Sequence, residues 1–395
     1  MTLPPIHRRH FLSLGAATLA SCGGSSASPF GPASSLAPDQ KQKMLITLAM
    51  LANVNYGITA TTEAELVANT AKIEKTLTSG PIQGFFQSPW QVVWGPVITN
   101  SRRPSASGQA PYFVTDNTLY VAKGRDPTTG QTMYAVGIAG TNIVSSQDWL
   151  AEDFNVLKTV DWLPIDTSLT VGASYGKISL GTHTGLNRLL ALRDPRLGQN
   201  VLEFLLSLDL GQAFDIAVTG HSLGGALTPA LALKILETLS AQGCTHLTVS
   251  AYPAAGPTPG DSQFAAYATQ RLGKNYRSII NRYDIVPASW QVDTLLNLPG
   301  LYASASFSGL VQAMPIEKKL ALDFAIAATR SIGYTRIATD REYVFNGPPS
   351  AAVVNVLPPV PYFNEASFQH TKAYLMNGLN LPADVIAAIF DMNSI

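Results

Sequence analysis

Phe214-Asp-Ile-Ala-Val-Thr-Gly-His-Ser222-Leu-Gly-Gly225 is the stretch of sequence that decides the fold. Its first six residues predict a buried strand, and the run from Leu223 to Leu239 predicts a long helix directly after the turn. The Gly-x-Ser-x-Gly pattern is typical of a sharp strand-to-helix turn, in which glycines let the strand and the helix approach closely. Such a turn raises the Ser222 hydroxyl above the sheet, at the positive end of the following helix.

A second match to this pattern, Gly172-Ala-Ser174-Tyr-Gly176, shows that the pattern alone is weak evidence. Ser174 lies between two extended stretches and precedes Lys177-Ile-Ser-Leu, with no helix after it. A glycine-rich turn explains this match, whereas Ser222 has both the strand and the helix that the motif requires. We therefore take Ser222 as the candidate nucleophile.

The rest of the body alternates between predicted strands and helices, which indicates an α/β fold. Helices of ten or more residues between strands imply a mostly parallel central sheet that is covered by helices on both faces. A turn signal at Asp126–Gly130 predicts a hairpin of strands at 119–121 and 133–138. The later strands are expected at Phe214–Thr219, Leu247–Ala251 and Tyr276–Asn281. The helices are expected at Lys41–Ala52, Thr62–Leu77, Leu186–Leu206 (broken at Pro195), Leu223–Leu239 and Ser262–Arg271.

The composition narrows the class of protein. Of the 395 residues, 46% are hydrophobic and 13% are charged, which excludes wholesale disorder and provides for a buried core. The 26 basic residues balance 26 acidic ones, which argues against a nucleic-acid partner because holding phosphates needs a basic surplus. Two cysteines are too few for a disulfide scaffold or a zinc cluster. No cluster with metal-ligand spacing appears, so no metal is expected, and nothing in the sequence indicates a cofactor. The composition does not indicate an oligomeric state.

The N-terminus is predicted to be a targeting segment. Arg8-Arg9 precedes an uncharged apolar run that is too short to cross a bilayer and resembles a twin-arginine export signal. Leu19-Ala-Ser-Cys22 resembles the lipobox of bacterial lipoproteins. We expect a signal peptide over 1–21, lipidation of Cys22 and a flexible tether over 22–38. The protein would then be exported and membrane-anchored at the cell envelope (outer membrane or periplasmic face), or secreted if the lipobox is incidental. The alternative is a short helix with incidental arginines.

A serine nucleophile needs a base, and elimination among the histidines leaves His370. In this type of fold the chain order is serine, then acid, then histidine. His221 points away from its neighbour Ser222, and His246 begins a predicted strand before any plausible acid. The remaining histidines lie in the targeting segment or before the serine: His7, His10 and His183.

The acid that orients this histidine is expected to be Asp284. It closes the stretch Tyr276–Tyr283 at the carboxyl end of a predicted strand, where such acids lie. Its main rival, Asp261, begins the helix Ser262–Arg271, so capping of that helix explains it fully.

The residues collected so far resemble the class 3 lipases, the family of fungal triacylglycerol lipases and their bacterial and plant relatives. Gly220–Gly225 matches the Gly-His-Ser-Leu-Gly-Gly signature, and Val136–Thr141 is similar to the strand that ends in the oxyanion-hole residue. The further matches, in family order, are Gly256-Pro257, Gly260-Asp261, Asp284-x-Val286-Pro287 and Gln369-His370 with Tyr374. The resemblance covers about residues 130–290 and 363–376. It implies an α/β-hydrolase fold.

The resemblance also implies roles for individual residues. Thr141 would contribute its amide and hydroxyl, and Leu223 its amide, to an oxyanion hole for the oxygen that becomes negative when an ester is attacked. Residues 142–147 would take the place of the family's lid. One departure is Ala139, which stands where the family usually has an arginine before the Gly-Thr pair.

The stretch between Asp284 and His370 is longer than in the compact fungal lipases. Residues 291–345 interrupt the alternation of strands and helices and are predicted to be a largely helical insertion within one hydrolase domain over 39–395. The insertion is rich in apolar residues. Two interpretations remain open: a second lid or substrate wall, and an ordinary extension of the core.

The sequence thus predicts a serine hydrolase that cleaves carboxylic esters of lipid-like substrates, as a triacylglycerol lipase or esterase. A phospholipase A1 and a polyester or short-chain esterase are alternatives that these residues do not separate. A surface lipoprotein that only binds lipid or a partner is a different class. The complete set of serine, acid, histidine and oxyanion residues argues against it, because binding alone needs none of them.

Overall fold

The computed structural model describes residues 30, 32–34, 37–104, 110–140, 155–165, 174–337, 340–350 and 358–392. The predictions for the signal peptide over 1–21, for Cys22, for Thr141 and for the segment 142–147 lie outside these ranges, as does most of the tether over 22–38. Within these ranges, no helix combines the length and the apolar character that spanning a bilayer requires.

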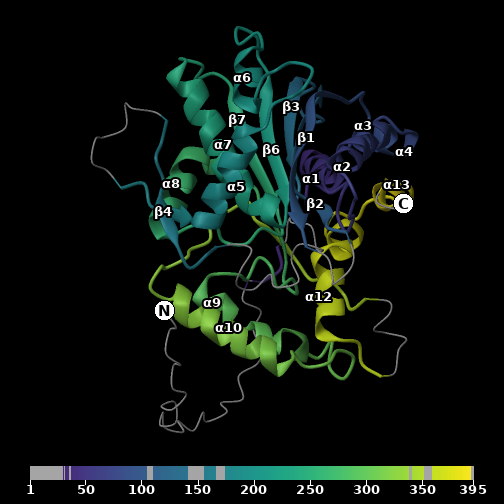
Figure 1. The fold of residues 1–395 in the computed structure, drawn as a ribbon, viewed down its shortest axis with the longest axis vertical. Helices are drawn as coiled ribbons and strands as arrows, with labels where there is room; N and C mark the ends of the chain where they lie inside the picture. Colours follow the sequence, from purple (N-terminus) through teal and green to yellow (C-terminus); the bar gives the residue numbers. More distant parts are fainter. Residues whose placement is uncertain are drawn as a thin grey trace, which may run out of the picture.

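The centre of the molecule is a seven-stranded sheet with the order β1-β2-β3-β6-β7-β8-β9 (Figure 1). The strands are β1 Gln91–Arg103, β2 Tyr112–Arg125, β3 Thr132–Ile138, β6 Asp215–His221, β7 Thr248–Ala254, β8 Ile279–Asn281 and β9 Tyr343–Phe345. The first three strands pair antiparallel, which confirms the predicted hairpin, and β3 and β6 to β9 run parallel. A small second sheet pairs β4 Thr159–Asp161 with β5 Lys177–Ser179.

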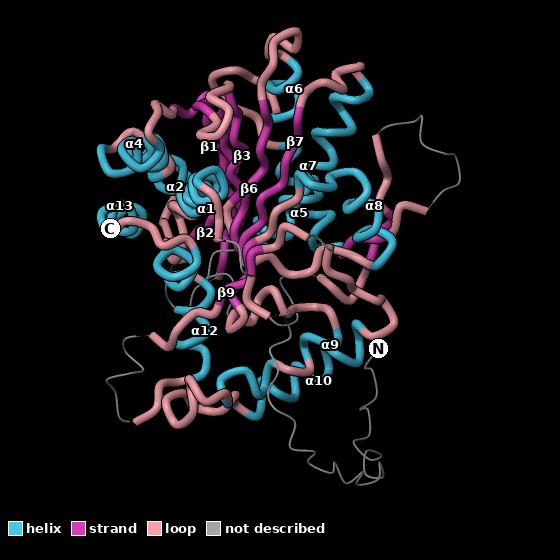
Figure 2. The backbone as a smooth tube through the Cα atoms, turned by 180° about the vertical axis from the view of Figure 1, so that it is seen from behind, coloured by secondary structure: helices cyan, strands magenta, loops and turns pink. Residues whose placement is uncertain are grey.

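Helices cover both faces of the sheet, as the α/β prediction requires (Figures 1 and 2). On one face lie α1 Gln40–Ala52, α2 Glu63–Asn69, α3 Ala71–Leu77, α4 Gly80–Phe86 and α13 Ala383–Met392. On the other lie α5 Leu180–Ala191, α6 Val201–Leu206, α7 Leu223–Ala241 and α8 Ser262–Leu272, followed by the short η1 Gly273–Asn275. At the carboxyl end of the parallel strands lie α9 Val292–Leu295, η2 Leu298–Ala303, α10 Ile316–Thr329, α12 Tyr362–His370 and η3 Tyr374–Gly378.

Two predicted helices differ from the observed ones. The single helix expected over Thr62–Leu77 is two helices that meet at Thr70, whose hydroxyl donates a hydrogen bond to the Val67 carbonyl at 2.7 Å. Threonine makes such local bonds in competition with the helix ladder, which explains a boundary there. The break at Pro195 is confirmed, and the second segment begins with a capping box between Asn200 and Glu203.

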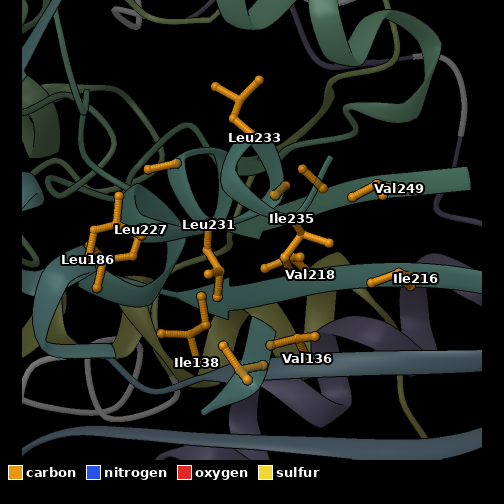
Figure 3. Close-up of a cluster of buried hydrophobic side chains, with 14 of the residues drawn as sticks. Val136, Ile138, Leu186, Ile216, Val218, Leu227, Leu231, Leu233, Ile235 and Val249 are labelled. Atoms are coloured by element: carbon orange, nitrogen blue, oxygen red, sulfur yellow. The ribbon is translucent and has the colours of Figure 1, made fainter. Parts of the chain in front are cut away.

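The long helix α7 packs on the sheet through an apolar face. In Figure 3, Leu231 of α7 points toward Ile138 of β3 and Val218 of β6, and all three are fully buried. A second buried cluster fills the opposite face, where α1, α3, α4 and α13 cover the same strands. Burial of large aliphatic side chains stabilises the fold by roughly 1.5–3 kcal/mol each, so the two faces together hold the sheet rigid.

The predicted insertion over 291–345 contains α9, η2 and α10, but it does not end as a helical segment. Its last residues, Tyr343–Phe345, form β9, which pairs in parallel with β8 at the edge of the main sheet. A three-residue strand carries too little periodicity to be recognised. The insertion therefore returns the chain to the sheet before α12 begins.

The fold depends on a close backbone approach between α7 and the loop after β7. A Cβ atom on Gly256 would lie 2.6 Å from the backbone carbon of Gly225, so the substitution Gly256→Ala forces these segments apart. We expect it to destabilise the protein by about 1–3 kcal/mol, measured as a lower midpoint of thermal unfolding. Gly300→Ala is the control, because nothing lies within 4 Å of its Cβ position. Equal midpoints for both variants would contradict this packing.

Candidate active site

The turn at Ser222 has the geometry that the sequence predicts. Ser222 joins β6 to α7 with φ of 59° and ψ of −125°, a conformation that a residue with a side chain rarely adopts. Its N–H donates to the Ala254 carbonyl at 3.0 Å. A Cβ atom on Gly220 would lie 2.3 Å from the Gly224 carbonyl oxygen, and one on Gly224 would lie 2.5 Å from the Ile138 oxygen. Only glycine fits at these two positions.

The second Gly-x-Ser-x-Gly match, of which residues 174–176 are described, does not lead into a helix, as predicted. Ser174 is exposed, its hydroxyl donates to the Gln263 side chain at 2.7 Å, and the chain after it enters β5 rather than a helix.

His370 and Asp284, the predicted base and acid, lie together. The Nδ1–H group of His370, the last residue of α12, donates to Oδ2 of Asp284 at 2.9 Å. Asp284 is fully buried in the turn after β8, and its Oδ1 accepts the Val286 N–H at 2.9 Å. The His370 side chain keeps 14% of its surface exposed. The carboxylate thus holds the imidazole from the interior while part of the side chain stays exposed.

Tyr374 is a partner of this pair whose role the sequence did not indicate. Its hydroxyl donates to Oδ2 of Asp284 at 2.9 Å and accepts the Asn281 N–H at 3.0 Å. Burial and the neighbouring carboxylate raise the pKa of Tyr374 well above its ordinary value, so the hydroxyl stays a neutral donor. The carboxylate of Asp284 is therefore satisfied by hydrogen bonds although it has no contact with water.

His221 connects the serine turn to the histidine segment. Its Nε2 lies 2.7 Å from the His370 carbonyl oxygen, and the two imidazole rings lie 4.6 Å apart between centroids. Burial and the adjacent His370 lower the pKa of His221 from 6.5 to about 3. The ring is therefore neutral at ordinary pH, and its Nε2–H must donate to the carbonyl. Sequence reasoning excluded His221 as the base but missed this contact.

A buried polar network fixes the helix that ends in His370. Asn281 donates from Nδ2 to the Gln369 carbonyl at 2.9 Å and to its side-chain oxygen. The amide of Gln369 donates in turn to Glu365 at 2.7 Å and to the Pro348 carbonyl at 2.7 Å. Satisfied polar networks of this kind specify one arrangement, because any displacement leaves buried groups unpaired.

The space above Ser222 is bordered by the end of β3 and by the insertion. A Cβ atom on Gly140 would lie 2.9 Å from Ser222 Cβ, so the two backbones touch. Leu223 is half-buried and packs against a cluster that includes Trp290 and, from α10, Ala325. Of the two predicted oxyanion residues, Leu223 therefore lies at the turn, and Thr141 lies outside the described residues. Among the described residues, no three His, Cys, Asp or Glu side chains converge on a metal site.

The strand order and the serine turn at the carboxyl end of β6 define an α/β-hydrolase. Residues 135–293 match the family described as Lipase (class 3). A lipase of Rhizomucor miehei is 37% identical over 75 residues, which span 19% of this chain and 20% of that protein. The crystal structure of M37 lipase superposes with a TM-score of 0.67 at 29% identity, covering 89% of this chain and 98% of that one.

A lipase from Rhizopus microsporus var. chinensis aligns with a TM-score of 0.40 at 18% identity, over 66% of this chain and 74% of that one. The family match over residues 135–293 and the M37 likeness support a carboxylic ester hydrolase that is similar to the class 3 lipases.

The buried neutral state of His221 predicts a pH dependence of stability. The unfolded chain takes up this proton near pH 6.5 and the folded chain only near 3. The free energy of unfolding therefore falls as the pH drops below about 6.5. This histidine alone accounts for up to about 1.4 kcal/mol per pH unit, and above pH 6.5 it has no effect on stability. We expect His221→Gln to show a shallower acid slope in urea titrations between pH 4 and 6.5.

The matched control for this titration is His246→Gln, which removes an exposed histidine that also bonds a backbone carbonyl, that of Leu210. An equal change of slope in both variants would contradict the assignment to His221.

Proposed function

We propose that the chain hydrolyses carboxylic esters of lipid-like substrates through Ser222, His370 and Asp284. The observation that carries the proposal is the His370–Asp284 hydrogen bond, joined by His221 to the strained turn at Ser222. A serine in a strained turn, linked through its neighbour His221 to a histidine that a buried carboxylate orients, suits a nucleophile with its base.

The chemistry follows from the proton positions. Asp284 holds the Nδ1–H tautomer of His370, which leaves Nε2 free to accept a proton. As Ser222 Oγ forms its bond to the ester carbonyl carbon, its proton passes to Nε2, and His370 then gives that proton to the departing alcohol. A water molecule then attacks the acyl carbon, and the bond between that carbon and Ser222 Oγ breaks. His370 takes a proton from the water and returns it to Ser222.

The negative oxygen of each tetrahedral intermediate needs donors. The first amides of a helix have no partner within it, and Leu223 is the first residue of α7. We propose that its N–H and that of Thr141 donate to this oxygen. Removing one donor of this kind costs about 3–4 kcal/mol of transition-state stabilisation.

The surface of the insertion supports a lipid-like substrate rather than a freely soluble one. Ile316, Leu320 and Phe324 recur every fourth residue on the outer side of α10 and are 68%, 63% and 61% exposed. The inner side of the same helix packs toward Leu223. An apolar stripe on a helix whose inner side packs toward Leu223, the residue after the serine, suits a substrate presented in an aggregate or a membrane. The insertion is thus both part of the core and a border of the site.

The nucleophile is tested by substitution at both serine motifs. Ser222→Ala is expected to abolish cleavage of a p-nitrophenyl ester and labelling by a fluorophosphonate, because Ser222 is the proposed nucleophile that forms the covalent bond. Ser174→Ala, the matched control in the second Gly-x-Ser-x-Gly turn, is expected to keep both. An unlabelled and inactive wild type, or labelling that survives in Ser222→Ala, would overturn the proposal.

The substrate class is tested on α10. The double substitution of Leu320→Ser and Phe324→Ser is expected to lower the rate on emulsified long-chain triacylglycerol by about tenfold or more. The same variant should keep its rate on a soluble short-chain ester, because the serine turn is untouched. Val67→Ser on α2, another exposed apolar position, serves as control. Equal losses on both substrates, or no loss on the emulsion, would favour a short-chain esterase.

A further inference from the structure

Asn53 ends the N-terminal helix α1 at the same end of the sheet as the serine turn, beyond the carboxyl end of β3. It is the C-cap residue of that helix and is 8% exposed. Asn53 lies outside residues 135–293, which carry the family match. Ten of the thirteen residues of α1 are buried, and the helix contacts β6 and β3. Its end is therefore held firmly by the core.

The side chain of Asn53 bonds to the backbone just beyond β3. The Gly140 N–H donates to Asn53 Oδ1 at 2.8 Å, and both groups are buried. Strand pairing with β2 extends to the Ala139 N–H, which donates to the Thr118 carbonyl at 3.0 Å. Beyond Ala139, the neighbouring strand β6 has ended and the chain has entered α7. Asn53 therefore supplies the acceptor for the Gly140 N–H that a strand partner would otherwise provide. A buried N–H without an acceptor would cost about 1–3 kcal/mol.

Gly140, just beyond the end of β3, lies against Ser222, the proposed nucleophile. The position of a Cβ on Gly140 lies 2.9 Å from both Ser222 Cβ and the His221 carbonyl oxygen, and 3.6 Å from Asn53 Oδ1. The glycine backbone is thus held between Asn53 on one side and the serine turn on the other. A small rotation of the Gly140 backbone would change the space beside Ser222 and the direction of the peptide bond that follows Gly140.

We propose that Asn53 is a positioning residue, which fixes the Gly140 backbone beside Ser222 and thereby orients the peptide that follows it. The inference rests on the proposed function, in which that next amide is an oxyanion donor. In this proposal Asn53 acts on the site through Gly140. Its removal should therefore slow the chemical step and leave substrate binding nearly intact, because the donor contributes most when the negative oxygen forms.

The test compares three variants on a soluble p-nitrophenyl ester. Asn53→Leu keeps the shape but removes the acceptor, and it should lower kcat by about 10- to 100-fold with KM changed less than about threefold. Asn53→Asp retains an acceptor oxygen and should recover at least part of that loss. The matched control is Asn55→Leu. Asn55 is also buried, with 2% exposure, two residues further along, but it bonds to Leu66 and Thr115 on α2 and β2.

The control separates positioning from stability. Both leucine variants should unfold at lower temperature, and only Asn53→Leu should lose kcat when measured well below its unfolding midpoint. Equal kcat losses in both, an unchanged kcat in Asn53→Leu, or no recovery by Asn53→Asp would overturn the inference while the wild type stays active. An inactive wild type that no fluorophosphonate labels would instead overturn the proposed function.

Discussion

The arrangement depends on one constraint: the backbone of Ser222 is held in a conformation that costs about 1–3 kcal/mol for a residue with a side chain. The hydrogen bond to Ala254 and the glycine contacts on either side of the turn maintain it. Because α7 and β6 are buried against one another, the strain cannot relax without separating them. The position of the proposed nucleophile and that of the helix amides beside it are therefore consequences of the same packing.

The remaining groups come from parts of the chain far from this turn. Asp284 follows β8, whereas His370 arrives on α12 after the insertion, and Tyr374 secures the carboxylate from η3. The N-terminal helix adds Asn53 at the end of β3. Segments outside the matched family region thus supply the proposed base and the supports of the site. Their positions depend on buried hydrogen bonds rather than on exposed ion pairs.

Much of the fold could be predicted because its signals are local. The strand, the glycines and the helix around Ser222 follow each other in the sequence, and chain order pointed to Asp284 and His370, which the structure brings together. The contacts of His221, Tyr374 and Asn53 could not, because each joins residues distant in the chain through a single hydrogen bond. The strand β9 was missed for a similar reason: three residues become a strand only by pairing with β8. The roles of Thr141 and Cys22 stay predictions.

The central claim is that the ester's acyl group is transferred to Ser222. Its most direct test is rapid quenching of the wild-type protein during turnover of a slowly released ester, followed by peptide mass spectrometry. The account predicts a mass increase equal to one acyl group on the peptide that contains Ser222, appearing before steady state and disappearing when the substrate is exhausted. Turnover with no adduct, or an adduct on another residue such as Ser174, would contradict it.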